Sequence, residues 1–124
     1  MVNDQHLTRL FRTKGVQQRL ESGELLYEQG SEPQTVYYIS DGRLALHRAG
    51  EDGSSILIAE KLSGDIVGES SALDGGLRTV SASATQSSEI MGMPSEEFRQ
   101  ELLADAGLCF EVAVGLARVL RSAT

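Results

Sequence analysis

Turn-forming residues recur through the middle of the chain and divide residues 15–94 into short segments. Gly, Ser-Gly or Asp-Gly closes each stretch of apolar and β-branched residues, as in TVYYIS before Asp41-Gly42. Asp-Gly is typical of tight hairpins because both central positions of the turn favour positive φ. Short strands at near-regular spacing favour an antiparallel barrel or sandwich. The predicted strands are residues 16–21, 24–29, 35–40, 43–49, 54–62, 65–69, 78–84 and 89–94.

A helical pattern precedes the strands. The spacing of apolar residues over residues 4–13 predicts a short amphipathic helix, with Asn3 or Asp4 as its N-cap and Gly15 as its stop. The apolar face of this helix consists of Leu7, Leu10 and Phe11.

Helical patterns also follow the strands. Residues 95–107 open with Ser95, and the two glutamates Glu96 and Glu97 that follow it are close to a capping box. This arrangement predicts a helix that begins at Ser95. Its predicted apolar stripe consists of Phe98, Leu102 and Leu103.

Gly107 is expected to break or bend this segment, and residues 108–122 to form a final helix. The apolar residues of that helix cannot all lie on one stripe, so it must pack against something beyond its own sheet. A second copy of the chain, a ligand or a further domain would each serve, and we expect a homodimer or a contact with an output domain here. The residues are Leu108, Phe110, Val112, Val114, Leu116, Val119 and Leu120.

This order of elements predicts the fold class α+β. We expect an antiparallel β-roll, a jelly-roll-like barrel of about eight strands. The N-terminal helix would occupy residues 1–14, the roll residues 15–94 and the C-terminal helices residues 95–124. The chain has 124 residues, of which 40% are hydrophobic, and this size favours one domain, residues 1–124.

Composition and charge exclude several classes of function. The net charge of −7 repels a phosphate backbone, and aromatic residues, at 5%, are too scarce for a base-stacking platform. Neither a signal peptide nor a stretch of the roughly 20 apolar residues needed to span a bilayer is expected. The sequence therefore predicts a cytoplasmic protein that binds neither nucleic acid nor membrane by itself.

Catalytic and metal-binding patterns are missing as well. His6 and His47 are the only histidines and do not form a close pair, so no metal site is expected. The serines lack a Gly-x-Ser-x-Gly elbow, and neither the Walker pattern nor the dinucleotide fingerprint occurs. Cys109, the single cysteine, is expected to be a small buried hydrophobe. We therefore expect a protein that is not an enzyme and carries no cofactor.

The stretch GESSALDGGLRTVSA, residues 68–82, is the strongest candidate for a binding site. Gly68 permits close approach of the backbone, and the following residues suffice for one helical turn, whose N–H groups suit an anion. Arg78 follows on a short loop, and its planar guanidinium matches a phosphate. Glu69 would instead accept from a hydroxyl, so the pattern points to a nucleotide monophosphate. A simple ion pair between Glu69 and Arg78 is the alternative.

Residues 64–82, GDIVGESSALDGGLRTVSA, resemble the phosphate-binding cassette of the cyclic nucleotide-binding domain family. Residues 23–46, GELLYEQGSEPQTVYYISDGRLAL, are similar to the glycine-punctuated strands of that family. The resemblance extends over nearly the whole chain. It implies a β-roll with a short cassette helix, cAMP or cGMP as the ligand, and C-terminal helices that close over the pocket as a lid.

The resemblance also implies a role for individual residues. Glu69 would accept from the ribose 2′-hydroxyl and Arg78 would bind the cyclic phosphate. Thr79 would offer its backbone N–H and a hydroxyl for a guanine base. The remaining implied ligand-binding residues are Gly68, whose backbone approaches the ligand closely, Ser70 and Ser71 through their backbones, and Val67 and Val80 along the base and sugar.

Three residues depart from the family pattern. Ser70 and Ala72 replace large aliphatic residues, and Leu77 replaces a frequent proline before the arginine. Two other functions therefore stay open beside a sensor domain that transmits ligand binding. One is a β-roll without nucleotide binding that serves dimerisation or docking. The other is the ligand-sensing part of a transcription regulator of the catabolite-activator type.

Overall fold

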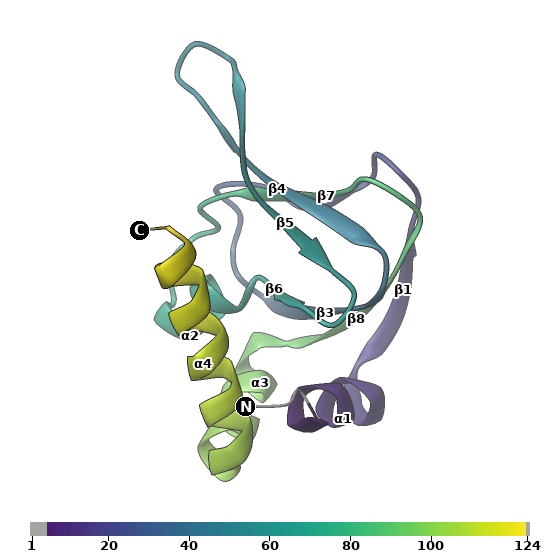
Figure 1. Cartoon of the computed structure of the whole chain (residues 1–124), viewed down its shortest axis with the longest axis vertical. Helices are drawn as coiled ribbons and strands as arrows, with labels where there is room; N and C mark the ends of the chain where they lie inside the picture. Colours follow the sequence, from purple (N-terminus) through teal and green to yellow (C-terminus); the bar gives the residue numbers. More distant parts are fainter. Residues whose placement is uncertain (1–4, 124) are drawn as a thin grey trace.

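The computed structural model describes residues 5–123 and confirms the predicted α+β roll of eight strands with four helices (Figure 1). The predicted N-cap residues Asn3 and Asp4 lie outside the described residues. In chain order the elements are α1 (Gln5–Lys14), β1 (Val16–Leu20), β2 (Leu25–Tyr27), β3 (Thr35–Asp41), β4 (Arg43–Ala49), β5 (Ser55–Leu62), β6 (Ile66–Val67), α2 (Glu69–Asp74), β7 (Ser81–Ala84), β8 (Ser88–Pro94), α3 (Ser95–Ala104) and α4 (Ala106–Ser122).

Two four-stranded antiparallel sheets form the roll. One has the strand order β1-β8-β3-β6 and the other β2-β7-β4-β5. The inward-facing residues of both sheets make a continuous apolar core, as the alternation in antiparallel strands requires. This inter-sheet core consists of Leu20, Ile39, Leu44, Val67, Ala82, Ala84 and Ile90.

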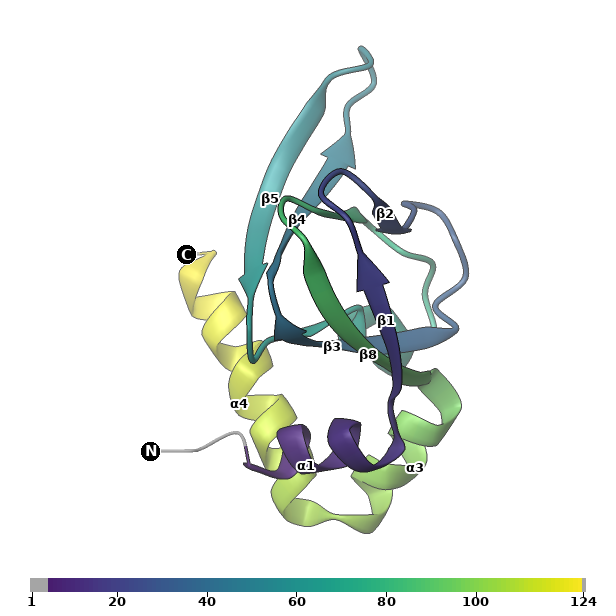
Figure 2. The same cartoon turned by 90° about the vertical axis from the view of Figure 1, so that its right-hand side faces the viewer.

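A second core joins the helices to the roll. α1 and α3 cover one end of the roll, and α4 runs along its side (Figure 2). Phe11 of α1 is fully buried, and its ring centroid lies 5.6 Å from that of Tyr38 and 6.1 Å from that of Phe98. These three rings connect α1, β3 and α3, so the helices are fixed to the sheet that carries the cassette. Leu7, Leu10, Val36, Ala72, Met93, Leu102, Leu108 and Val112 complete this core.

The predicted Asp-Gly turn between residues 41 and 42 separates β3 from β4. Gly42 has φ +136°, and a Cβ at this position would collide with the backbone and side chain of Ser88. Only glycine fits both conditions, since it has no Cβ and adopts positive φ without strain. This turn lets consecutive strands leave one sheet and enter the other.

The predicted strand over residues 78–84 begins too early. In the structure β7 starts at Ser81, and Arg78 lies in a loop outside the ladder. The backbone N–H of Arg78 donates to the carbonyl of Ser31 at 2.9 Å, and its carbonyl accepts from the N–H of Gly30 at 2.8 Å. These bonds to the β2–β3 loop replace the expected strand pairing.

The capping box predicted at Ser95 is wrong. Pro94 is the N-cap of α3, and no side chain caps the helix. The hydroxyl of Ser95 instead donates to the carbonyl of Pro33 at 2.6 Å. Within the predicted apolar stripe Phe98 and Leu102 are buried, whereas Leu103 is 83% exposed.

The break between the last two helices falls at Asp105, two residues before the predicted position at Gly107. Asp105 has an extended backbone, and its carboxylate accepts from the N–H of Leu108 at 3.1 Å. An aspartate at this position caps the first turn of the next helix. Gly107 therefore lies inside α4, where it faces the ring of His6.

The apolar residues of α4 divide between two faces, as the sequence predicts. Leu108 and Val112 are buried, whereas Phe110, Val119 and Leu120 are exposed. Cys109 is also exposed, so its predicted burial is wrong: it lies on the solvent side of the first turns of α4. None of the helices in residues 5–123 has both the length and the hydropathy needed to cross a membrane.

Candidate functional site

The cassette begins where β6 ends. Gly68 has φ +82° and is the N-cap of α2, and Gly75, with φ +79°, is its C-cap. Both glycines adopt the left-handed conformation that other residues avoid, which explains how a six-residue helix fits between a strand and a loop. The helical turn predicted after Gly68 is thus confirmed, and it spans Glu69–Asp74.

Arg78 is the most buried charged group of the site, with 4% of its surface exposed. Its Nη1 donates to the carbonyl of Gly68 at 2.6 Å, and its Nη2 donates to the carbonyl of Thr35 at 2.5 Å. The carbonyl of Thr35 faces the β6 edge of β3, where β6 pairs only with Tyr37 and Tyr38, so no strand reaches Thr35 and Arg78 supplies the donor. Nε of Arg78 is a buried polar atom that has no partner within residues 5–123.

The segment from Tyr27 to Ser31 also contacts Arg78, through a ring and through backbone hydrogen bonds. The ring centroid of Tyr27 lies 4.2 Å from Cζ of Arg78, and the β2–β3 loop binds its backbone at Gly30 and Ser31. Sequence reasoning assigned no role in the site to these residues. The sequence predicted only a turn at Gly30-Ser31. Contacts between residues more than forty positions apart leave no local pattern from which they could be predicted.

Glu69 is the second buried charged residue of the cassette, with 8% of its surface exposed. Burial raises the pKa of its carboxyl above the ordinary value of 4.5, although its own backbone N–H and the charges of Lys61 and Arg78 act in the opposite direction. Among the ion pairs of residues 5–123, none joins Glu69 to Arg78. The alternative in which these two side chains simply neutralise each other is therefore not what the structure shows.

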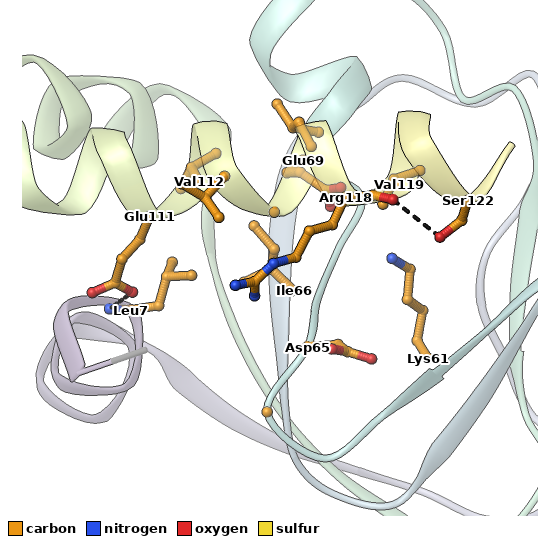
Figure 3. Close-up of a pocket in the computed structure, with 14 residues that line it drawn as sticks. Leu7, Lys61, Asp65, Ile66, Glu69, Glu111, Val112, Arg118, Val119 and Ser122 are labelled. Atoms are coloured by element: carbon orange, nitrogen blue, oxygen red, sulfur yellow. Dashed lines mark hydrogen bonds between the residues drawn. The ribbon is translucent and has the colours of Figure 1, made fainter. Parts of the chain in front are cut away.

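A cavity of about 240 Å³ lies between the cassette and the last helix (Figure 3). Glu69 forms part of its wall, together with Asp65 of the β5–β6 connection and Ile66 of β6. Arg118 of α4 and Lys61 of β5 reach into the same space from opposite sides (Figure 3). Arg78 does not line this cavity, so the two buried charges of the cassette face different surroundings.

The other predicted site residues differ in their exposure. Ser70 and Thr79 are exposed, and Val80 is half-buried just before β7. Ser71 is buried, and its hydroxyl donates to the carbonyl of Leu77 at 3.2 Å, which ties α2 to the loop that carries Arg78. Val67 is fully buried in the inter-sheet core. Their contacts with a ligand stay predictions.

The roll thus has eight strands, a short helix that begins after the left-handed Gly68, and a buried arginine that bonds to the Gly68 carbonyl. The family model of the cyclic nucleotide-binding domain matches residues 17–105. The chain belongs to this family, and the fold and family predicted from the sequence are both confirmed.

Individual relatives agree with this assignment. The chain is 31% identical over 101 residues to the cyclic AMP receptor protein of Thermus thermophilus, covering 82% of this chain and 47% of the receptor. It is 28% identical over 104 residues to the lysophospholipase NTE1 of Phaeosphaeria nodorum, covering 84% of this chain and 7% of that protein. The chain thus spans about half of the receptor and a small part of the lysophospholipase.

Solved structures share the architecture. The catabolite activator protein of Thermus thermophilus superposes with a TM-score of 0.83 at 26% identity, covering 95% of this chain and 55% of that one. A transcriptional regulator of Thermotoga maritima gives a TM-score of 0.83 at 22% identity, covering 94% of this chain and 91% of that one, and shows the fold alone.

Gly68 should be less tolerant of a side chain than the other glycine cap of α2. A Cβ at residue 68 would lie 2.5 Å from Nη1 of Arg78, whereas a Cβ at Gly75 would meet nothing within 4 Å. Both positions have positive φ, so Gly75→Ala reports the backbone strain alone, about 1 kcal/mol. We expect Gly68→Ala to lower the free energy of unfolding, measured with urea, by at least 1 kcal/mol more. Equal losses in the two variants would contradict this account.

Proposed function

We propose that the chain is a regulatory domain, not an enzyme, that binds cAMP or cGMP at the cassette. Arg78 binds the cyclic phosphate, with the backbone N–H groups of Ser71 and Thr79 beside it, and Glu69 accepts from the ribose 2′-hydroxyl. The observation that carries this proposal is the buried guanidinium of Arg78, whose Nε–H has no partner within residues 5–123. An unpartnered buried donor is costly, and a phosphate oxygen would satisfy it.

Glu69 supports a ligand that offers a hydroxyl. Its carboxyl is buried but forms no ion pair with Arg78, and it faces the cavity under α4. A carboxylate accepts hydrogen bonds and repels a phosphate, so a sugar hydroxyl is the matching group. A ribose phosphate carries a partner for each of these two charges, a phosphate for Arg78 and a hydroxyl for Glu69.

The last helix supplies a route for the signal. α4 shares the cavity with Glu69, so a ligand held by the cassette would also touch the helix. A ligand shifts a conformational equilibrium only through its different affinities for the two states. We propose that closure of α4 over the ligand passes the signal on through the exposed face of this helix, including Leu120, to a second copy or an output domain. The resemblance to the cyclic AMP receptor protein and to the catabolite activator protein supports this route. We also propose that the protein is cytoplasmic.

A thermal-unfolding series with cAMP, cGMP and the linear nucleotide AMP tests the proposal. A ligand at about one hundred times its dissociation constant stabilises the folded state by about 2.7 kcal/mol, which shifts Tm by an amount on the order of 10 °C. We expect one of the cyclic nucleotides to give this shift at lower concentration than AMP. If none of them shifts Tm, a β-roll for dimerisation or docking becomes the better reading.

Glu69→Gln should stabilise the free protein and weaken binding. The carboxyl has a raised pKa in the folded state, so its stabilising contribution is greatest below pH 4.5 and is lost as the pH rises through the raised value. At neutral pH the neutral amide avoids this cost, and we expect a higher free energy of unfolding in urea than that of the natural protein. The affinity for cyclic nucleotide should fall by about tenfold, because the charged acceptor is lost.

The pH dependence of binding provides the control for Glu69. Nucleotide affinity of the natural protein should decrease as the pH falls through the raised pKa of Glu69, and the Glu69→Gln variant should lack this decrease. Glu96→Gln, on an exposed part of α3, should behave like the natural protein. The same pH profile in all three proteins would remove Glu69 from the site.

A further inference from the structure

A column of three flat groups runs from β3 to the cassette loop. The rings of Tyr37 and Tyr27 are stacked, with centroids 6.1 Å apart and planes inclined by 17°. The guanidinium of Arg78 continues the column, with Cζ 4.2 Å from the centroid of the Tyr27 ring. The strands that carry the two tyrosines belong to different sheets, so the column bridges the roll at the position of Arg78.

A guanidinium can contact an aromatic ring with its face and donate hydrogen bonds from its edge at the same time. All five N–H groups of arginine lie in the plane of the guanidinium, whereas an aromatic ring contacts its face. Cζ of Arg78 lies over the Tyr27 ring, and both terminal nitrogens are engaged elsewhere. These terminal nitrogens, Nη1 and Nη2, donate to the carbonyls of Gly68 and Thr35, and the Nε–H is left without a partner within residues 5–123.

We propose that Tyr27 is a positioning residue of the site: its ring fixes the plane of the Arg78 guanidinium so that the unpartnered edge is held ready for a phosphate. The proposal rests on the assignment of Arg78 as the phosphate-binding residue. A long side chain that is ordered before the ligand arrives loses less conformational freedom on binding, and the affinity rises accordingly.

Several features of Tyr27 suit this role. Its ring lies on β2 beside a register shift in the β2–β7 ladder, and such irregularities redirect a side chain. Burial raises the pKa of Tyr27 to about 12, although the charge of Arg78 lowers it, so the phenol stays neutral beside the cation at ordinary pH. The ring rather than the hydroxyl makes the contact, which predicts that phenylalanine can replace it.

Calorimetry with cAMP and cGMP on a set of variants tests the proposal. We expect Tyr27→Phe to bind within about twofold of the natural protein, and Tyr27→Leu to bind about tenfold more weakly, because a cation–π contact in a desolvated site contributes roughly 1–2 kcal/mol. Tyr38→Leu is the control for lost stability: Tyr38 stacks on Phe11 in the other core, so this variant should melt earlier and keep its affinity. Equal affinities of Tyr27→Phe and Tyr27→Leu would overturn the proposal.

A measurement on the nucleotide-free protein tests whether Tyr27 positions Arg78, independently of whether the protein binds nucleotide. In the free protein the Nε–H proton of Arg78 should show a ring-current shift in its NMR spectrum that Tyr27→Phe preserves and Tyr27→Leu removes. The same shift in all three proteins would overturn the positioning of Arg78 by Tyr27. A natural protein that shows the shift but binds no nucleotide would overturn the proposed function and leave the positioning intact.

Discussion

Arg78→Ala is expected to weaken the binding of cyclic nucleotide by 10- to 100-fold or more. The phosphate would lose a charge-assisted hydrogen bond in a buried site, which contributes about 1.5–3 kcal/mol. The same change should also destabilise the free protein. The carbonyls of Gly68 and Thr35 lose their donor, and each buried acceptor left without a partner costs about 1–3 kcal/mol. Calorimetry measures the first effect and urea unfolding the second.

Two further variants separate the effect of Arg78 on affinity from its effect on stability. Arg78→Lys keeps the charge but not the planar fork, so it should fold and bind with an affinity between those of Arg78→Ala and the natural protein. Arg43→Ala removes an exposed arginine whose guanidinium lies 3.6 Å from Glu60, and both affinity and stability should change little. Unchanged affinity in Arg78→Lys and Arg78→Ala would remove Arg78 from the site.

Phe11→Ala is expected to produce the largest loss of stability, about 3–5 kcal/mol. The ring is fully buried and lies against Tyr38 and Phe98, so its removal leaves a cavity where α1, β3 and α3 meet. Such a loss is a large part of the total stability of a domain of this size. We expect a decrease in Tm of more than 10 °C by calorimetric or circular-dichroism melting.

Leu103→Ala is the control for Phe11. Leu103 is 83% exposed on α3, so its truncation should change the free energy of unfolding by less than about 0.5 kcal/mol. A small effect of Phe11→Ala, comparable with that of Leu103→Ala, would show that the helices are not fixed to the roll by this aromatic cluster.

Local patterns in the sequence were sufficient to predict the order of helices and strands and the roll that they form. Glycine turns mark the strand ends, and the apolar spacing of Leu7, Leu10 and Phe11 identifies the buried face of α1, because both signals depend on neighbouring residues. The errors arose where a distant residue determined the local conformation. Arg78 lies outside β7 because the β2–β3 loop binds its backbone, and Ser95 does not cap α3 because its hydroxyl reaches Pro33.

The site was predictable in part for the same reason. Gly68, Glu69 and Arg78 lie within eleven positions, and their spacing together with the family resemblance predicted a binding loop. The support of Arg78 by Tyr27 and Thr35 was not predictable, since it joins residues more than forty positions apart. Hydrogen bonds from Arg78 to backbone carbonyls leave no signal in the sequence of the acceptors, because every residue has a carbonyl group.

Isothermal titration calorimetry of the natural protein with cAMP and with cGMP tests the central claim most directly. We predict saturable binding of at least one of them, with one nucleotide per chain, and at least tenfold weaker binding in the Arg78→Ala variant. A natural protein that melts cooperatively but gives no heat of binding with either nucleotide would contradict the claim that the cassette is a nucleotide site.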